Sequence, residues 1–128
     1  MIRSKKMKYW TKEELDVLNK ITTVQNHPND DEGQIFQDSP IWVVTNNNHV
    51  YLRAGKGKES KWYKSGLKNG GAIEFNNQTY PVNYVAVEDE DEIKAVTDAY
   101  EAKYHGQYPI DMMVSDKCAT ATVRLDLQ

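Results

Sequence analysis

The chain has 128 residues and a mass of 14.7 kDa, the size of one domain, so we expect residues 1–128 to form a single domain with residues 1–10 as a mobile tail. Its 16 Lys and Arg against 19 Asp and Glu give a net charge of −3, and a mean hydropathy of −0.76 without a long apolar run predicts no membrane-spanning helix. The single cysteine, Cys118, excludes an intramolecular disulfide and favours a cytoplasmic protein.

The first predicted helix begins at a capping box, in which Thr11 and Glu14 each satisfy the other's exposed backbone amide. Residues at helical spacing then extend it over about three to four turns, namely Leu15, Leu18 and Ile21 followed by Thr22 and Gln25. Residues 26–29 end the helix, and a polar loop is expected to run to Asp38.

A β-hairpin is predicted next, because residues 40–45 and 50–53 are rich in β-branched and aromatic side chains. Its turn at residues 46–49 contains three asparagines, which tolerate the positive φ of tight turns. Residues 55–71 hold several glycines and lysines, and we expect mostly loop there, with about one helical turn near residues 62–67.

A second hairpin is predicted from residues 72–75 and 78–82, with its turn at Asn76 and Asn77. Its second strand continues or bends through residues 84–87. Pro81 inside this strand indicates an edge, a bulge or a change of strand partner, since proline cannot donate to a sheet ladder.

The second helix is expected from about Glu90 to Tyr104 and is closed by His105 and Gly106. The acidic run at residues 88–92 is interpreted as its first turn, where carboxylates favour the positive end of the helix dipole, rather than as a metal site. Residues 119–125 alternate with period two and predict a final strand.

The predicted elements are about six strands, mostly in consecutive hairpins, and two helices. They predict a mainly β fold, an antiparallel barrel or sheet with peripheral helices, and not a doubly wound nucleotide-binding fold.

The charge is concentrated in one segment. Residues 53–68 carry a local charge of +5, which leaves −8 for the remainder of the chain. This segment has the residue types that bind a phosphorylated ring compound. A phosphate would be held by the cations and the hydroxyl of Arg53, Lys58, Ser60 and Lys61. A flat ligand would stack on the rings of Trp62 and Tyr63.

Two other interpretations of this segment stay open. It would equally be a solvated lysine-rich loop whose Trp62 and Tyr63 pack in the core. Single-stranded nucleic acid needs the same residue types, but the charge of −8 elsewhere disfavours it.

The usual catalytic motifs are missing from the sequence, so no catalytic residue is assigned. Cys118 is predicted as a small buried residue rather than a nucleophile. The three histidines, at positions 27, 49 and 105, are widely separated, and no metal site is predicted.

Several strings together resemble a small bacterial family of unknown function, grouped with the FMN-binding split-barrel proteins that include pyridoxamine-phosphate oxidase and the deazaflavin-dependent nitroreductases. The strings that carry the resemblance lie at residues 40–44, 50–53, 61–63, 77–82 and 99–104. The resemblance implies a six-stranded antiparallel Greek-key split barrel with peripheral helices, and a homodimer that binds FMN between its subunits. It places the cofactor-binding residues at Arg53, Lys58, Ser60, Lys61, Trp62 and Tyr63.

The sequence and this resemblance together predict an FMN-binding protein, either an oxidoreductase that acts on a small molecule or its non-catalytic descendant. A deazaflavin is the alternative cofactor. The alternative function is a cofactor-free binding protein for an anionic metabolite or a protein partner.

Overall fold

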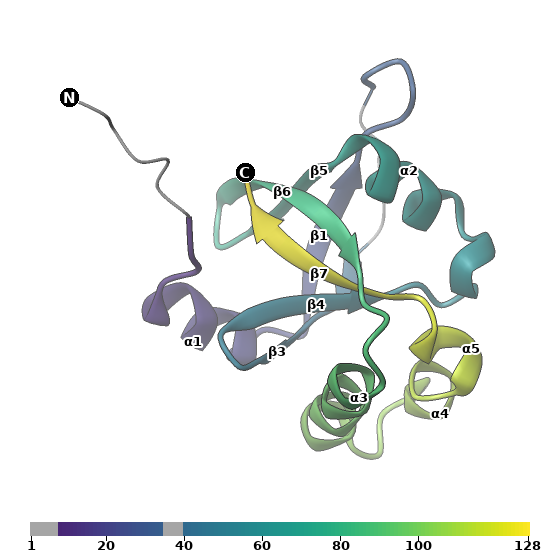
Figure 1. Cartoon of the computed structure of the whole chain (residues 1–128). Helices are drawn as coiled ribbons and strands as arrows, with labels where there is room; N and C mark the ends of the chain where they lie inside the picture. The colour runs from purple at the N-terminus through teal and green to yellow at the C-terminus, as the bar shows by residue number, and fades with distance from the viewer. Residues whose placement is uncertain (1–7, 35–39) are drawn as a thin grey trace.

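The computed structural model describes residues 8–34 and 40–128, so most of the expected tail at residues 1–10 lies outside the described residues (Figure 1). Trp10 is anchored in the core and does not belong to a tail. Its side chain is only 7% exposed, and its indole N–H donates to the carbonyl of Leu125 at 2.9 Å. In the described part of the chain, no helix is long and apolar enough to cross a membrane.

Within residues 8–34 and 40–128, seven strands form one antiparallel sheet, in the order β2-β1-β5-β6-β7-β4-β3. Their bounds are β1 Thr23–Pro28, β2 Pro40–Trp42, β3 Val44–Asn46, β4 His49–Arg53, β5 Gly71–Phe75, β6 Gln78–Ala86 and β7 Thr122–Leu127. The two outermost strands, β2 and β3, are separated in sequence by Val43 alone, so the two ends of the sheet meet and the sheet curls into a nearly closed barrel. The predicted barrel with peripheral helices is confirmed, with seven strands instead of six.

Helices surround the barrel (Figure 1). Their bounds are α1 Lys12–Lys20, a 3-10 turn η1 Gly57–Glu59, α2 Lys61–Asn69, α3 Glu90–Tyr104, α4 Ile110–Met113 and α5 Asp116–Ala119. The predicted capping box of α1 is present, and α3 has the predicted bounds, with Asp89 as its N-cap and three carboxylates in its first turn.

Both predicted hairpins are present, and their turns have the geometry that asparagine allows. Asn47 and Asn48 have φ of 51° and 66°, and Asn76 and Asn77 have φ of 53° and 62°. Pro81 lies next to the point where β6 changes partner, because β6 pairs with β5 over residues 78–82 and with β7 over residues 82–86.

Several boundaries predicted from the sequence were wrong. The first helix ends at Lys20, and residues 23–28 form β1 instead of further helix turns. The helix α2 has nine residues where about one turn was expected, and two short helices, α4 and α5, precede the last strand. Cys118 is buried, as predicted, but lies in α5 and not at the start of a strand.

The two faces of the sheet have separate cores. Along β4, Val50 and Leu52 point into the barrel, where they pack with side chains of the other strands and of α1. Tyr51 points to the outer face, which α3, α4 and α5 cover with a second apolar cluster around Val96 and Tyr100. Position along β4 therefore decides whether a side chain faces the barrel interior or the helices.

The junction between β2 and β3 is closed by the last turn of α3. The hydroxyl of Tyr104 accepts from the amide of Val43 at 3.0 Å and lies 2.7 Å from the carbonyl oxygen of Thr22. The ring of Tyr104 stacks on that of Trp42, with 3.9 Å between the ring centroids. The ammonium of the neighbouring Lys103 donates to the carbonyls of Leu18 and Val43 at 2.7 and 2.8 Å. Side chains of α3 thus satisfy backbone groups at the junction.

Candidate functional site

Arg53, the first residue of the predicted phosphate site, is fully buried on the outer face of the barrel. Its guanidinium donates to the carbonyls of Met113 and Ile93 at 3.0 and 2.9 Å, and to the hydroxyls of Thr97 and Thr122 at 2.7 and 2.9 Å. It also lies 5.2 Å from the centre of the Tyr100 ring.

These contacts join β4 to α3, α4 and β7, and burial lowers the pKa of Arg53. No salt bridge in the described part of the chain includes Arg53, so its charge is held by carbonyls, hydroxyls and an aromatic face. The structure therefore puts Arg53 in the protein interior, and we leave it out of the candidate ligand site.

The predicted aromatic pair follows the core-packing interpretation. Tyr63 is only 5% exposed, and burial raises the pKa of its hydroxyl. Trp62 is partly buried and packs against the barrel core, with its ring 6.0 Å from that of Tyr84 and 6.4 Å from that of Tyr63. Neither ring is placed as an open stacking platform for a flat ligand.

The other three predicted residues come together at the amino-terminal end of α2. Lys58 lies in η1, Ser60 is the N-cap of α2, and Lys61 is the first residue of the helix. Ser60 is only 6% exposed, and its hydroxyl neither caps α2 nor bonds any other described residue. The first amides of α2 therefore lack a side-chain cap, and its first turn has no acidic residue.

This end of α2 is also the positive end of the helix dipole, so backbone and side chains have the same preference for an anion. The chain enters this end of α2 through η1, which begins at Gly57, and the φ of Gly57 is +75°. A Cβ at Gly57 would lie 2.9 Å from Cγ of Lys117, so only glycine permits this close approach of α5 to η1.

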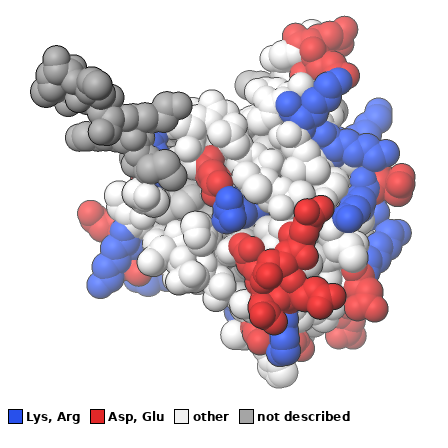
Figure 2. Space-filling model, in the orientation of Figure 1, with Lys and Arg blue, Asp and Glu red and all other residues white. Residues whose placement is uncertain are grey.

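The lysines form one basic face. Figure 2 shows Lys and Arg side chains gathered on the side of the molecule that carries η1 and α2, with a cluster of Asp and Glu side chains next to them. Lys64 lies 3.5 Å from Glu59, and Lys68 lies 3.1 Å from Asp31. No salt bridge among the described residues engages Lys58 or Lys61, so these two charges are available to a ligand.

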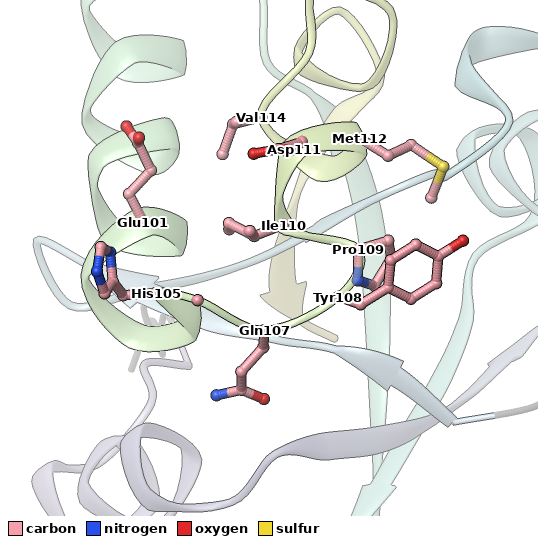
Figure 3. Close-up of a pocket in the computed structure, with 10 residues that line it drawn as sticks. Glu101, His105, Gln107, Tyr108, Pro109, Ile110, Asp111, Met112 and Val114 are labelled. Carbon is pink, nitrogen blue, oxygen red and sulfur yellow. The ribbon is translucent and has the colours of Figure 1, made fainter.

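A groove of about 720 Å³ lies between α3 and α4, lined by residues 101, 105–112 and 114 (Figure 3). We call it the α3–α4 groove. No element was predicted from the sequence at residues 107–114, and so the groove was not predicted. The large apolar side chains of Tyr108 and Met112, which are exposed at the groove, were the available signal in this stretch of the sequence.

A polar network that sequence reasoning also missed joins β4, β7 and α3. The hydroxyl of Tyr51 donates a hydrogen bond to Glu92 at 2.6 Å. The guanidinium of Arg124 donates two hydrogen bonds to the carboxylate of Asp126, at 2.8 and 2.9 Å. Burial and the Glu92 contact raise the pKa of Tyr51. Among the described residues, no three His, Cys, Asp or Glu side chains gather to hold a metal ion. The network ties the start of α3 to the sheet.

Comparison with known proteins places this geometry in a family. The profile of a bacterial family described as "Uncharacterized protein conserved in bacteria (DUF2255)" matches residues 14–125. The chain belongs to the DUF2255 family. The match begins within α1 and ends within β7, so it includes nearly all of the barrel and the basic face of this DUF2255 chain. None of the curated proteins matches its sequence.

Solved structures similar to this DUF2255 chain are split-barrel proteins. The conserved hypothetical protein Rv2991 from Mycobacterium tuberculosis has a TM-score of 0.67 and 15% identity, covering 93% of this chain and 79% of its own. A candidate 5-nitroimidazole antibiotic resistance protein from Bacteroides thetaiotaomicron has a TM-score of 0.63 and 13% identity, and the alignment covers 100% of this chain and 91% of that protein. HutZ, the heme storage protein from Vibrio cholerae, has a TM-score of 0.58 and 15% identity, and the alignment covers 91% of this chain and 88% of HutZ. At these identities the likeness shows the fold alone.

Proposed function

We propose that this DUF2255 protein binds a phosphorylated cofactor of the flavin class, with its phosphate at the amino-terminal end of α2. One observation carries the proposal: Lys58 and Lys61, which form no salt bridge with the described residues, flank Ser60 at a helix terminus that the Ser60 hydroxyl does not cap. Cations, a hydroxyl and free amides are the donors that a phosphate monoester accepts from. The flavin is proposed as the ligand because strings of the sequence resemble the FMN-binding split-barrel proteins. The similar solved structures share the fold, and one of them, HutZ, is described as a heme storage protein.

The residues at hand fit the two ends of FMN unequally. The phosphate end has two lysines, a hydroxyl and uncapped helix amides as donors, whereas Trp62 and Tyr63 pack in the core and give the ring system no cradle. We therefore propose that the ring lies in a cleft that a second copy of the chain completes. A bound flavin would supply the redox chemistry, and this chain would supply anchorage of its phosphate.

Titration of the purified protein with FMN and with riboflavin, followed by flavin fluorescence, tests the proposal. We expect saturable FMN binding and weaker riboflavin binding, because riboflavin lacks the phosphate. The double substitution Lys58→Ala with Lys61→Ala should weaken FMN binding at least about tenfold, because it removes two charge-assisted contacts.

Lys64→Ala with Lys68→Ala is the matched control. It removes the same charge from the same face, but both lysines already pair with carboxylates. Its effect should stay within about twofold. Equal binding of riboflavin and FMN, or an equal loss in both double variants, would contradict the phosphate site.

The absorption spectrum of the freshly purified protein decides between the cofactors, since a flavin and a deazaflavin absorb at different wavelengths. Binding of inorganic phosphate without binding of either cofactor would instead favour the alternative function, a cofactor-free protein that holds an anionic metabolite at the same helix terminus.

A further inference from the structure

The α3–α4 groove has two exposed carboxylates, Glu101 of α3 and Asp111 of α4, and exposed apolar side chains on the α4 side. Figure 3 shows Glu101 and His105 projecting from α3 on one side, Tyr108 and Met112 on the other, and Ile110 between them. The groove is open to solvent and has a volume of about 720 Å³. It lies on different residues from the phosphate site proposed at α2.

The electrostatics of the groove favour a cation. Glu101 and Asp111 are exposed carboxylates, and the lining includes no Lys or Arg. The groove also lies at the carboxyl-terminal end of α3, which is the negative end of a helix of 15 residues. The cation in that last turn, Lys103, does not neutralise it, because its ammonium points to the barrel junction and donates to Leu18 and Val43.

Two large apolar side chains at the groove, those of Tyr108 and Met112, are exposed to solvent. Tyr108 is 96% exposed, the highest value among the large apolar side chains that the structure describes, and Met112 is 45% exposed. Pro109 and Ile110 add partly exposed apolar surface beside them. Burial of such surface against a ligand is favourable, and an exposed tyrosine face attracts an ammonium or guanidinium group.

We propose that the α3–α4 groove binds an extended peptide segment of a partner protein, in which lysine or arginine alternates with apolar residues. The arginine or lysine groups pair with Glu101 and Asp111 and lie against the Tyr108 ring. The apolar side chains cover Met112 and Ile110. Nucleic acid and anionic membranes are disfavoured, because their phosphates would face two carboxylates and a negative helix end. The groove's volume of about 720 Å³, lined by both carboxylates and apolar side chains, suits a chain segment better than a compact amine.

The test uses a fluorescein-labelled peptide of sequence Leu-Arg-Leu-Arg-Leu-Arg and measures its fluorescence anisotropy against the full chain. We expect saturable binding. The double substitution Glu101→Gln with Asp111→Asn should weaken it at least about tenfold, and Tyr108→Ala should weaken it about fivefold. A peptide with glutamate in place of arginine should not bind.

Asp16→Asn with Asp98→Asn is the matched control, because it removes two exposed carboxylates that lie outside the groove lining. Its affinity should stay within about twofold of the parent chain. The proposal is wrong if this control loses as much affinity as the groove variant, or if no saturable binding occurs up to about 1 mM peptide. It is also wrong if spermidine alone binds as tightly as the peptide, since the groove would then take a small cation.

Discussion

Replacement of Arg53 by methionine separates a structural role of this residue from a ligand-binding one. Methionine keeps most of the length and apolar stem of the side chain but has no donors. The carbonyls of Ile93 and Met113 would each lose a hydrogen bond from a buried cation, and so would the hydroxyls of Thr97 and Thr122.

The expected cost follows from these four contacts. A buried acceptor left without its donor costs roughly 1–3 kcal/mol, and the threonine hydroxyls can partly recover by rotating to other acceptors. Thr122 already donates to the carbonyl of Ala119 at 2.7 Å. Relief of the desolvation cost of the guanidinium offsets part of the loss, since Arg53 has no carboxylate partner among the described residues. We expect a loss of about 3 kcal/mol in the free energy of unfolding, a large part of the roughly 5–15 kcal/mol of a typical domain.

Urea unfolding followed by tryptophan fluorescence measures this change, with Lys61→Met as the control at an exposed cation. The midpoint of Arg53→Met should fall by roughly 1–3 M without a change of slope, and Tm should fall by roughly 10 °C. The control should stay within about 0.5 kcal/mol. An Arg53→Met protein that keeps its stability but loses FMN binding would refute the structural role and restore Arg53 to the ligand site.

Three further predictions concern the barrel junction and α2. Burial lowers the pKa of Lys103 to about 8, so above that pH the folded state gives up a proton that the unfolded chain keeps, and the free energy of unfolding should rise from about pH 8 to pH 10. Thermal unfolding at several pH values checks this, and the rise should vanish in Lys103→Met; a rise that persists there belongs to another group. Tyr104→Phe removes the acceptor for the Val43 amide and should cost about 1–3 kcal/mol by urea unfolding, whereas Tyr108→Phe should cost almost nothing. Gly66→Ala should destabilise the fold by about 1–3 kcal/mol, because the new Cβ would lie 2.9 Å from the Tyr84 ring; a stabilised variant would mean that the ring moves aside freely.

The sequence predicted best the elements that local chemistry determines. The capping box begins α1, acidic residues begin α3, and asparagine pairs make both hairpin turns, because each of these signals acts within a few residues. The strand β1 was missed because one of its inward positions holds Asn26, which accepts a hydrogen bond from Tyr84 inside the barrel. A polar residue on the buried face hides the period-two pattern that marks a strand.

The candidate site was only partly predictable for a similar reason. Composition located the basic segment, and Lys58, Ser60 and Lys61 do lie together at one helix terminus. The burial of Arg53 depends on α3 and β7, whose contributing residues lie 40 to 69 positions further along the chain. No pattern near Arg53 reveals that distant carbonyls and hydroxyls will take up its donors.

The closure of the sheet at Val43 limits how this protein can associate with others. A sheet normally offers the backbone of its outer strands to another chain, but here β2 and β3 are each only three residues long and meet at the same point. Side chains of α3 already take up the backbone amide and carbonyl of Val43. Addition of a strand from a partner would have to displace Tyr104 and Lys103 first. Partners are therefore expected to recognise side-chain surfaces, such as the basic face or the α3–α4 groove, and aggregation by strand pairing is disfavoured at this junction.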